Sequence, residues 1–118
     1  MRAPCQVLWL ALLLAAACGA SADHPEVEYL LDYVANSGCT FVRNGDAHDA
    51  ADAAEHLRMK YQRAGRHAPT AETFIDRLAS ESSWTGKAYT VTCDGETRTS
   101  NSWLHRALAD YRSARPAP

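Results

Sequence analysis

The chain has 118 residues, with 12 basic and 14 acidic side chains and a formal net charge of −2. This length suits a single domain, and the lack of a basic excess argues against a nucleic-acid partner and against an anionic membrane surface. No G-K-[ST] phosphate-binding loop is present, and we expect no cofactor.

Residues 1–22 have the pattern of a secretory signal peptide. Arg2 precedes a run of 11 apolar residues, and a small-x-small cleavage signal ends at Ala22. The apolar run is too short to span a bilayer, so we expect no transmembrane segment. The alternative is a lipoprotein signal, with Cys18 as the lipidated residue. We favour cleavage after Ala22, which leaves residues 23–118 as one periplasmic domain with 11 basic and 14 acidic residues.

Two cysteines remain after this cleavage, Cys39 and Cys93. An even pair in a small exported domain indicates a disulfide, because the compartment is oxidising and the hydrophobic core is small. For a loop of this length, the chain-entropy relation gives roughly 4 kcal/mol of stabilisation.

The first predicted helix runs from Pro25 to about Ser37. Proline suits the first helical turn, and Gly38 stands where a helix commonly ends. Apolar residues recur at i, i+3, i+4 and i+7 and form one stripe: Val27, Leu30, Leu31 and Val34.

A short strand is predicted from Cys39 to Arg43, because threonine, phenylalanine and valine favour strands. Asn44-Gly45 would be a strong hairpin signal if a second strand followed it. Residues 46–49 lack strand formers and alanines follow them. We therefore expect the turn to lead directly into a helix.

Two helices are predicted next. The first has Asp49 as its N-cap and ends at Gly65, and the second begins at the capping residue Thr70 and ends in the polar loop SESSWTGK. Acidic residues dominate residues 23–55 and basic residues dominate 58–67. We interpret these charges as solvated helix faces.

The second predicted strand is Ala88–Cys93, in which tyrosine, valine and cysteine alternate with threonines. Asp94-Gly95 turns the chain into a last helix from about Ser102 to Arg112. A loose tail follows from about residue 113.

The order of these elements predicts an α+β fold. Two consecutive helices return the chain to the end where the first strand finished, so the two strands should be antiparallel. This pairing places the two cysteines opposite each other, within disulfide reach, and it pairs Phe41 with Val91 and Arg43 with Tyr89. We predict four helices, a two-stranded antiparallel sheet and one disulfide.

Several motifs resemble the YfeK-like family of small exported proteins of Gram-negative bacteria. They are F-x-R-N-G, an alanine-rich helix with H-L-R-x-K, T-A-E-x-F-I, and S-S-x-(S/T)-G-x-x-Y. The resemblance covers about residues 27–108. Asp49 stands where the family has serine or threonine, which is equivalent chemistry for a cap. The resemblance implies an exported domain of unknown function, and it implies no activity.

A metal site is one alternative interpretation. His48, Asp52 and His56 are spaced by four, but on one helix the two histidines would lie ~12 Å apart, too far for one ion. Asp52 and His56 supply at most two ligands, whereas zinc needs three or four. We therefore predict no metal ligands.

A hydrolase is the second alternative. It would combine an adjacent serine, Ser82 or Ser83, with His48, His56 or His105. The serines lack the strand-turn-helix elbow of serine hydrolases. We therefore predict no catalytic residues.

The remaining candidate site lies where the first turn meets the loop before the second strand. Loops gathered on a rigid scaffold commonly carry binding sites. A peptide or glycan carboxylate could dock there, with an arginine as a bidentate partner. Alternatively, Arg43 and Asn44 could be structural and bond to the SSWTG loop. The candidate binding residues are Arg43, Asn44, Gly45, His48, Ser82, Ser83 and Tyr89.

The sequence leaves the function unknown. It favours a non-enzymatic periplasmic module of the cell envelope that binds an unidentified envelope protein, peptide or glycan. A small envelope hydrolase or a metal-binding protein is the alternative.

Overall fold

A computed structural model describes residues 24–115. The predicted signal peptide, and the alternative at Cys18, lie outside the described residues. Within the described part, no helix combines the length and the apolar composition needed to cross a membrane.

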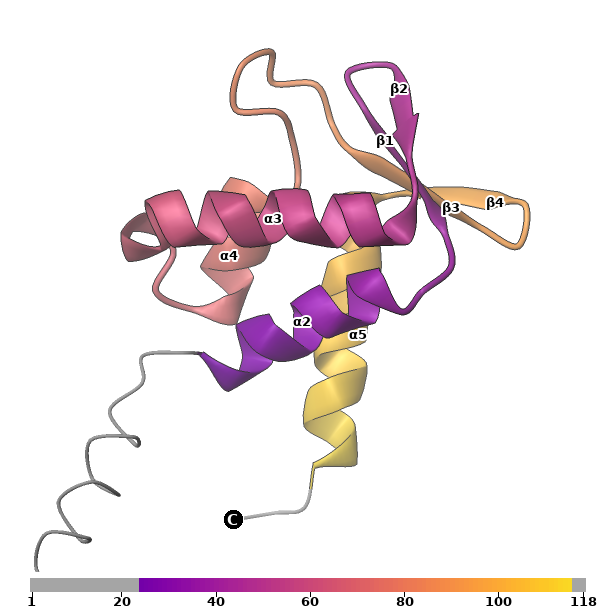
Figure 1. The fold of residues 1–118 in the computed structure, drawn as a ribbon. Helices are drawn as coiled ribbons and strands as arrows, with labels where there is room; N and C mark the ends of the chain where they lie inside the picture. Colours follow the sequence, from indigo (N-terminus) through magenta and orange to yellow (C-terminus); the bar gives the residue numbers. More distant parts are fainter. Residues whose placement is uncertain (1–23, 116–118) are drawn as a thin grey trace, which may run out of the picture.

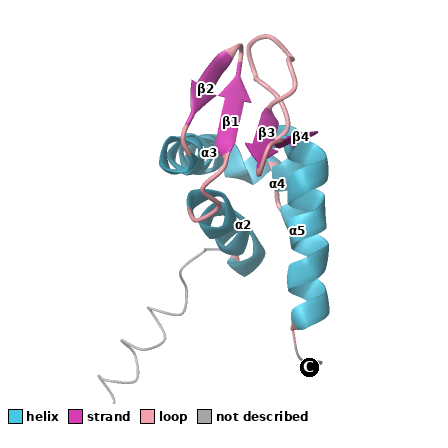
Figure 2. Ribbon diagram, turned by 90° about the vertical axis from the view of Figure 1, so that its right-hand side faces the viewer, coloured by secondary structure: helices cyan, strands magenta, loops and turns pink. Residues whose placement is uncertain are grey.

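Within residues 24–115, four α-helices form the body of the domain (Figure 1): α2 (Pro25–Ala35), α3 (Ala50–Ala64), α4 (Ala71–Leu78) and α5 (Ser100–Ala114). A 3-10 turn, η2 (Gly65–His67), links α3 to α4. The sheet stands at one end of this body, next to α3 and α5 (Figure 2).

Local sequence explains the helix boundaries. Asp49 caps α3 by accepting a hydrogen bond from the Asp52 amide, and α3 ends at Gly65, both as predicted. Thr70 caps α4 and forms a capping box with Thr73. The last helix begins at Ser100, two residues before the prediction, because the N-cap is Thr99.

The apolar stripes predicted for the helices form the core. The four stripe residues of α2 are 0–1% exposed. Phe74, Ile75 and Leu78 of α4 and Leu104 and Leu108 of α5 are also buried. Burial of these side chains is the main favourable contribution to folding.

The sheet has four antiparallel strands in the order β2-β1-β3-β4: β1 (Thr40–Arg43), β2 (Asp46–His48), β3 (Thr90–Cys93) and β4 (Glu96–Thr99). The central pair has the predicted register, with Phe41 opposite Val91. The prediction of two strands was wrong, because each central strand folds back into an edge strand.

The two missed strands follow equivalent turns. Asn44 and Gly45 have φ values of 52° and 87°, and Asp94 and Gly95 have 52° and 80°. Positive φ at both central residues is the geometry of a type I′ hairpin turn. The expectation that Asn44-Gly45 leads directly into a helix was wrong. The turn leads into β2, which pairs with β1.

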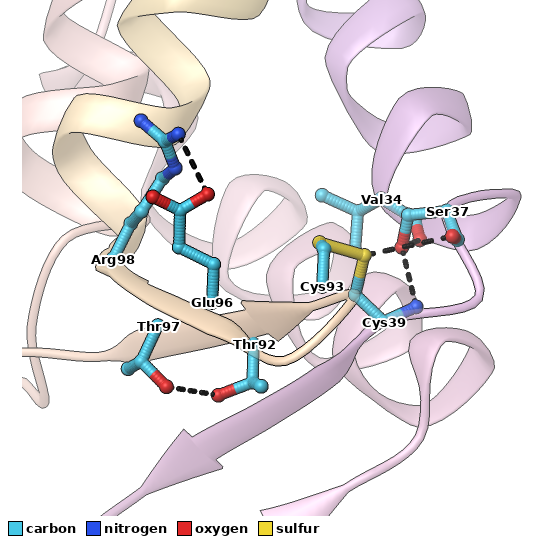
Figure 3. Close-up of a disulfide and its surroundings, with 8 residues drawn as sticks. All are labelled: Val34, Ser37, Cys39, Thr92, Cys93, Glu96, Thr97 and Arg98. Atoms are coloured by element: carbon cyan, nitrogen blue, oxygen red, sulfur yellow. Dashed lines mark hydrogen bonds and ion pairs between the residues drawn. A yellow bond between two sulfur atoms is a disulfide. The ribbon is translucent and has the colours of Figure 1, made fainter.

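The disulfide between Cys39 and Cys93 is present, as predicted (Figure 3). Their Cα atoms are 4.8 Å apart. The bond joins the residue before β1 to the last residue of β3. Ser37 supports this corner, because its hydroxyl donates to the Val34 carbonyl and accepts from the Cys39 amide.

Candidate functional site

A groove of about 590 Å³ lies between the β1–β2 hairpin, α3 and the loop before β3. We call it the cationic groove, because Arg43, Lys60 and Arg63 line it. Its apolar lining includes Met59, Leu78 and Trp84. Its volume lies in the range of ligand pockets in proteins.

One wall of the groove is the Trp84 loop, which we define as residues 82–87. In Figure 1 this loop rises above α3, beside the β1–β2 hairpin. Two backbone hydrogen bonds close it, from the Ser82 amide to the Lys87 carbonyl and from the Gly86 amide to the Ser82 carbonyl. A loop closed in this way holds its side chains at a defined position.

Ser82 ties the Trp84 loop to the hairpin. Its side-chain oxygen accepts hydrogen bonds from the Asn44 amide group and from the backbone amides of Trp84 and Thr85. In return, the Thr85 hydroxyl donates to the Asn44 side-chain oxygen over 2.7 Å. Asn44 therefore makes the contacts with the SSWTG loop that its structural role, the alternative to a binding role, required. These two bonds align the groove walls.

Arg43 does not join this network. Its guanidinium contacts His48, with 3.5 Å between Nη2 and Nε2. Within residues 24–115, Arg43, Lys60 and Arg63 form no ion pair with a carboxylate. The groove therefore gathers three cationic side chains that form no ion pair within the described chain.

Tyr89 lies at the base of the groove, 6% exposed. Its hydroxyl accepts a hydrogen bond from Lys60 Nζ over 3.1 Å and lies 3.3 Å from His56 Nε2. Lys60 also donates to the Glu81 carbonyl. These contacts hold Lys60 and His56 side by side, although both can carry positive charge.

Burial and neighbouring charges perturb these groups. The pKa of His56 is lowered by burial, and Arg43, Lys60 and His48 lower it further. The pKa of Lys60 is lowered by burial and by Arg43, although Glu81 opposes the shift. Because an anion in the groove would favour both charged forms, its binding should reverse these shifts.

Arg112 contrasts with Arg43, because carboxylates neutralise its charge. Arg112 forms a bidentate pair with Glu26, with both contacts at 2.8 Å, and also bonds Glu72 over 2.6 Å. The bond to Arg112 lowers the pKa of Glu72 to about 2. Arg112 thus links α5 to α2 and α4, a structural role that Arg43 lacks.

The predicted residues fall into distinct positions. Five of the seven line the cationic groove: Arg43, Asn44, Ser82, Ser83 and Tyr89. His48 lies in β2 beside Arg43, and Gly45 completes the exposed turn.

Sequence reasoning missed part of the groove. His56, Lys60 and Arg63 have the spacing i, i+4, i+7, which places them on one face of α3. That spacing was a usable signal, but we had interpreted the basic run as solvated. Trp84 and Met59 carried no signal of their own, because a lone apolar residue in a loop or helix has many explanations.

The groove chemistry favours binding over catalysis. The hydroxyl near His56 is a phenol whose pKa burial raises, so it is not an activated nucleophile. Ser82 accepts three hydrogen bonds from Asn44 and the loop backbone, and none from a histidine of the described residues. In the same part of the chain, no three histidine, cysteine, aspartate or glutamate side chains cluster closely enough to hold a metal ion.

These features define a small disulfide-linked α+β domain with a cationic groove beside one hairpin. The profile of the "Family of unknown function (DUF5329)" matches residues 21–112, and the chain belongs to this family. The uncharacterized protein YfeK of Salmonella typhimurium is 42% identical over 87 residues, which cover 72% of each chain. The resemblance to the YfeK-like family is thereby confirmed. No solved structure matches the chain.

Proposed function

We propose that the chain is a non-enzymatic binding module of the bacterial cell envelope, exported to the periplasm. Its cationic groove binds carboxylate groups of an envelope protein, peptide or glycan. The observation that carries this proposal is the set of three cations, Arg43, Lys60 and Arg63, that line one groove without a carboxylate partner in the described chain.

Each cation has a distinct part in this proposal. Arg43 offers a planar guanidinium, which suits bidentate contact with a carboxylate. Lys60 is held in place by Tyr89, so its ammonium needs little further ordering on binding. Arg63 is exposed at the groove rim, where it attracts an approaching anion.

Two features support the proposed location. The N-terminal pattern is that of a signal peptide, and a disulfide is typical of proteins in oxidising compartments. In the envelope, carboxylates are carried by peptides, glycans and protein surfaces, which all match the charge of the groove.

A titration with a defined envelope fragment tests the proposal. The probe is a disaccharide tetrapeptide from peptidoglycan, and the control is the same molecule with its carboxylates amidated. We expect the NMR signals of Arg43, His56 and Lys60 to shift with the probe, and at least tenfold weaker binding of the amidated form. Equal affinities, or shifts confined to the surface around Tyr33 and Trp103, would contradict the proposal.

The rival function is a small envelope hydrolase. One observation favours it: His56 lies within hydrogen-bond reach of the Tyr89 hydroxyl in a groove. The same titration separates the two functions, because a hydrolase would convert the probe over time. We expect the probe to be recovered intact after a day with the protein. Cleavage that is abolished by His56→Gln would establish the rival.

A further inference from the structure

Trp84 has an environment unlike that of any other large apolar residue among residues 24–115. It is 95% exposed, whereas the next most exposed large apolar residues, Met59 and Tyr33, are 38% and 37% exposed. At that exposure both faces of the indole contact solvent. The side chain therefore contributes almost nothing to the core and is available for contact with a partner.

The backbone beneath this side chain is held firmly. The Trp84 amide donates to the Ser82 side-chain oxygen, and so does the amide of Thr85. Thr85 in turn bonds Asn44 of the hairpin. A free indole on a fixed backbone is a pre-positioned anchor, since the main chain loses little freedom when the ring becomes buried.

The surroundings of Trp84 indicate what the anchor meets. Arg43, Lys60, Arg63 and Met59 line the groove beside it. Tryptophan, tyrosine, methionine and arginine are the residues enriched where proteins bind proteins, and tryptophan and arginine dominate binding hot spots. The cations call for carboxylates on the partner, because like charges across an interface are strongly unfavourable.

The two free faces of the ring distinguish between classes of partner. Anchor residues of protein interfaces are buried in well-packed, fully desolvated pockets. An indole with two free faces can be enclosed by such a pocket, which requires a folded partner. An anionic membrane is disfavoured by the net charge of −2 of the whole chain.

We propose that the Trp84 loop is a docking site for a folded acidic protein of the envelope. Trp84 inserts into an apolar pocket of that protein, and carboxylates at the pocket rim enter the cationic groove. This inference rests on the proposed function, because it identifies a protein surface as the source of the carboxylates.

Site-specific photocrosslinking in the cells that produce the full chain tests the inference. One variant carries a photoreactive phenylalanine analogue at position 84, and the control carries it at Thr97, an exposed residue of the other hairpin. We expect a discrete protein adduct at position 84 and none at 97. The adduct is identified by mass spectrometry, and the identified protein is purified for titration.

In that titration we expect Trp84→Ala to weaken binding at least thirtyfold and Arg43→Ala at least tenfold. The exposure of Trp84 means that its replacement leaves the fold intact. Equal crosslinking at both positions, no protein adduct, or unchanged affinity of Trp84→Ala would each overturn the inference. Trp84-dependent sedimentation with vesicles of phosphatidylethanolamine and phosphatidylglycerol would overturn it in favour of a membrane.

The disaccharide tetrapeptide keeps the two proposals separable. If the docking inference is wrong but the groove binds carboxylates, the probe binds wild type and no protein partner depends on Trp84. If the groove proposal is wrong, the probe does not bind wild type, whatever is crosslinked at position 84.

Discussion

The two hairpins of the sheet use the same turn and differ in what surrounds it. Asn44-Gly45 and Asp94-Gly95 have nearly identical φ values. Asn44 bonds to the Trp84 loop, and Arg43 in the strand before it faces the cationic groove. The Asp94 side chain forms no hydrogen bond with residues 24–115, and all of β4 is exposed. The second hairpin therefore shows what the turn does for the fold alone, and it serves as an internal control for the first.

The largest expected effect comes from cutting the link between the hairpins. Cys39→Ser removes the disulfide that joins the start of β1 to the end of β3. We expect a loss of roughly 2 to 5 kcal/mol in the free energy of unfolding. Urea denaturation of wild type and variant measures it. Labelling of the denatured, unreduced wild type with a thiol reagent provides the check, and two reactive thiols from Cys39 and Cys93 would contradict the account.

The second prediction compares the turn glycines. A Cβ at Gly45 or at Gly95 would meet no atom within 4 Å, so the strain expected at either position comes from the positive φ. We expect Gly45→Val and Gly95→Val to lose similar stability, roughly 1 to 3 kcal/mol each. Thermal unfolding measures both. Only Gly45→Val should also weaken binding of the disaccharide tetrapeptide, because only its turn positions the groove, and equal effects on binding would contradict this.

These turns also show how far the sequence could predict the fold. The helices and the caps Asp49 and Thr70 were predictable, because hydrophobic spacing and capping residues are local signals. The central register was predictable because the order of the elements and the two cysteines both indicate antiparallel pairing. Asp46–His48 was not, because it contains no strand formers, and Glu96–Thr99 was not, because its two threonines are separated by a charged residue. Both segments are held by pairing with β1 and β3. Tertiary pairing overrides weak local preference. Both dipeptides, Asn-Gly and Asp-Gly, were the available signal, and the strength of that turn was underestimated.

The site was predictable to a similar extent. The turn and the loop before β3 were identified from the strand register, which placed Arg43 near Tyr89. The contribution of α3 was missed, because a basic helix face is usually solvated. Only the packing of α3 against the hairpin turns His56, Lys60 and Arg63 toward the same groove as Arg43.

The third prediction isolates the bonds between the first hairpin and the Trp84 loop. Asn44→Ala loses two side-chain hydrogen bonds and the tolerance of asparagine for positive φ, whereas Asp94→Ala loses only that tolerance. We expect Asn44→Ala to be the less stable by about 1 kcal/mol. In a domain of this size this difference lowers the Tm by roughly 4 to 8 °C. Equal melting temperatures would mean that the loop is not tied to the hairpin.

The smallest expected effect is a pH dependence from His56. Its pKa is lower in the folded state than the usual value of about 6.5, so the unfolded chain binds the proton first as the pH falls. Stability from this group is present above pH 6.5 and is lost below it. Thermal unfolding at a series of pH values measures this effect, and His56→Gln should remove this part of the dependence of Tm on pH. An unchanged profile would show that His56 is not the titrating group.

The same histidine should make ligand affinity depend on pH in the opposite direction from stability. A bound carboxylate favours the imidazolium, so affinity for the disaccharide tetrapeptide should rise as the pH falls from 8 to 6. One coupled proton gives no more than about tenfold per pH unit. Calorimetry in two buffers with different ionisation enthalpies measures the proton uptake, and His56→Gln is the control. Release of protons on binding would contradict the groove as the site.

The most direct test of the central claim compares one arginine from each hairpin. Arg43 lines the groove without a carboxylate partner in the described chain, whereas Arg98 of β4 pairs with Glu96 at the surface. Isothermal titration with the disaccharide tetrapeptide is carried out on wild type, Arg43→Ala and Arg98→Ala. We predict equal affinity for wild type and Arg98→Ala, at least tenfold weaker binding for Arg43→Ala, and similar melting temperatures for all three. Equal affinity of Arg43→Ala and wild type, or no binding by wild type, would contradict the claim that this groove binds carboxylates.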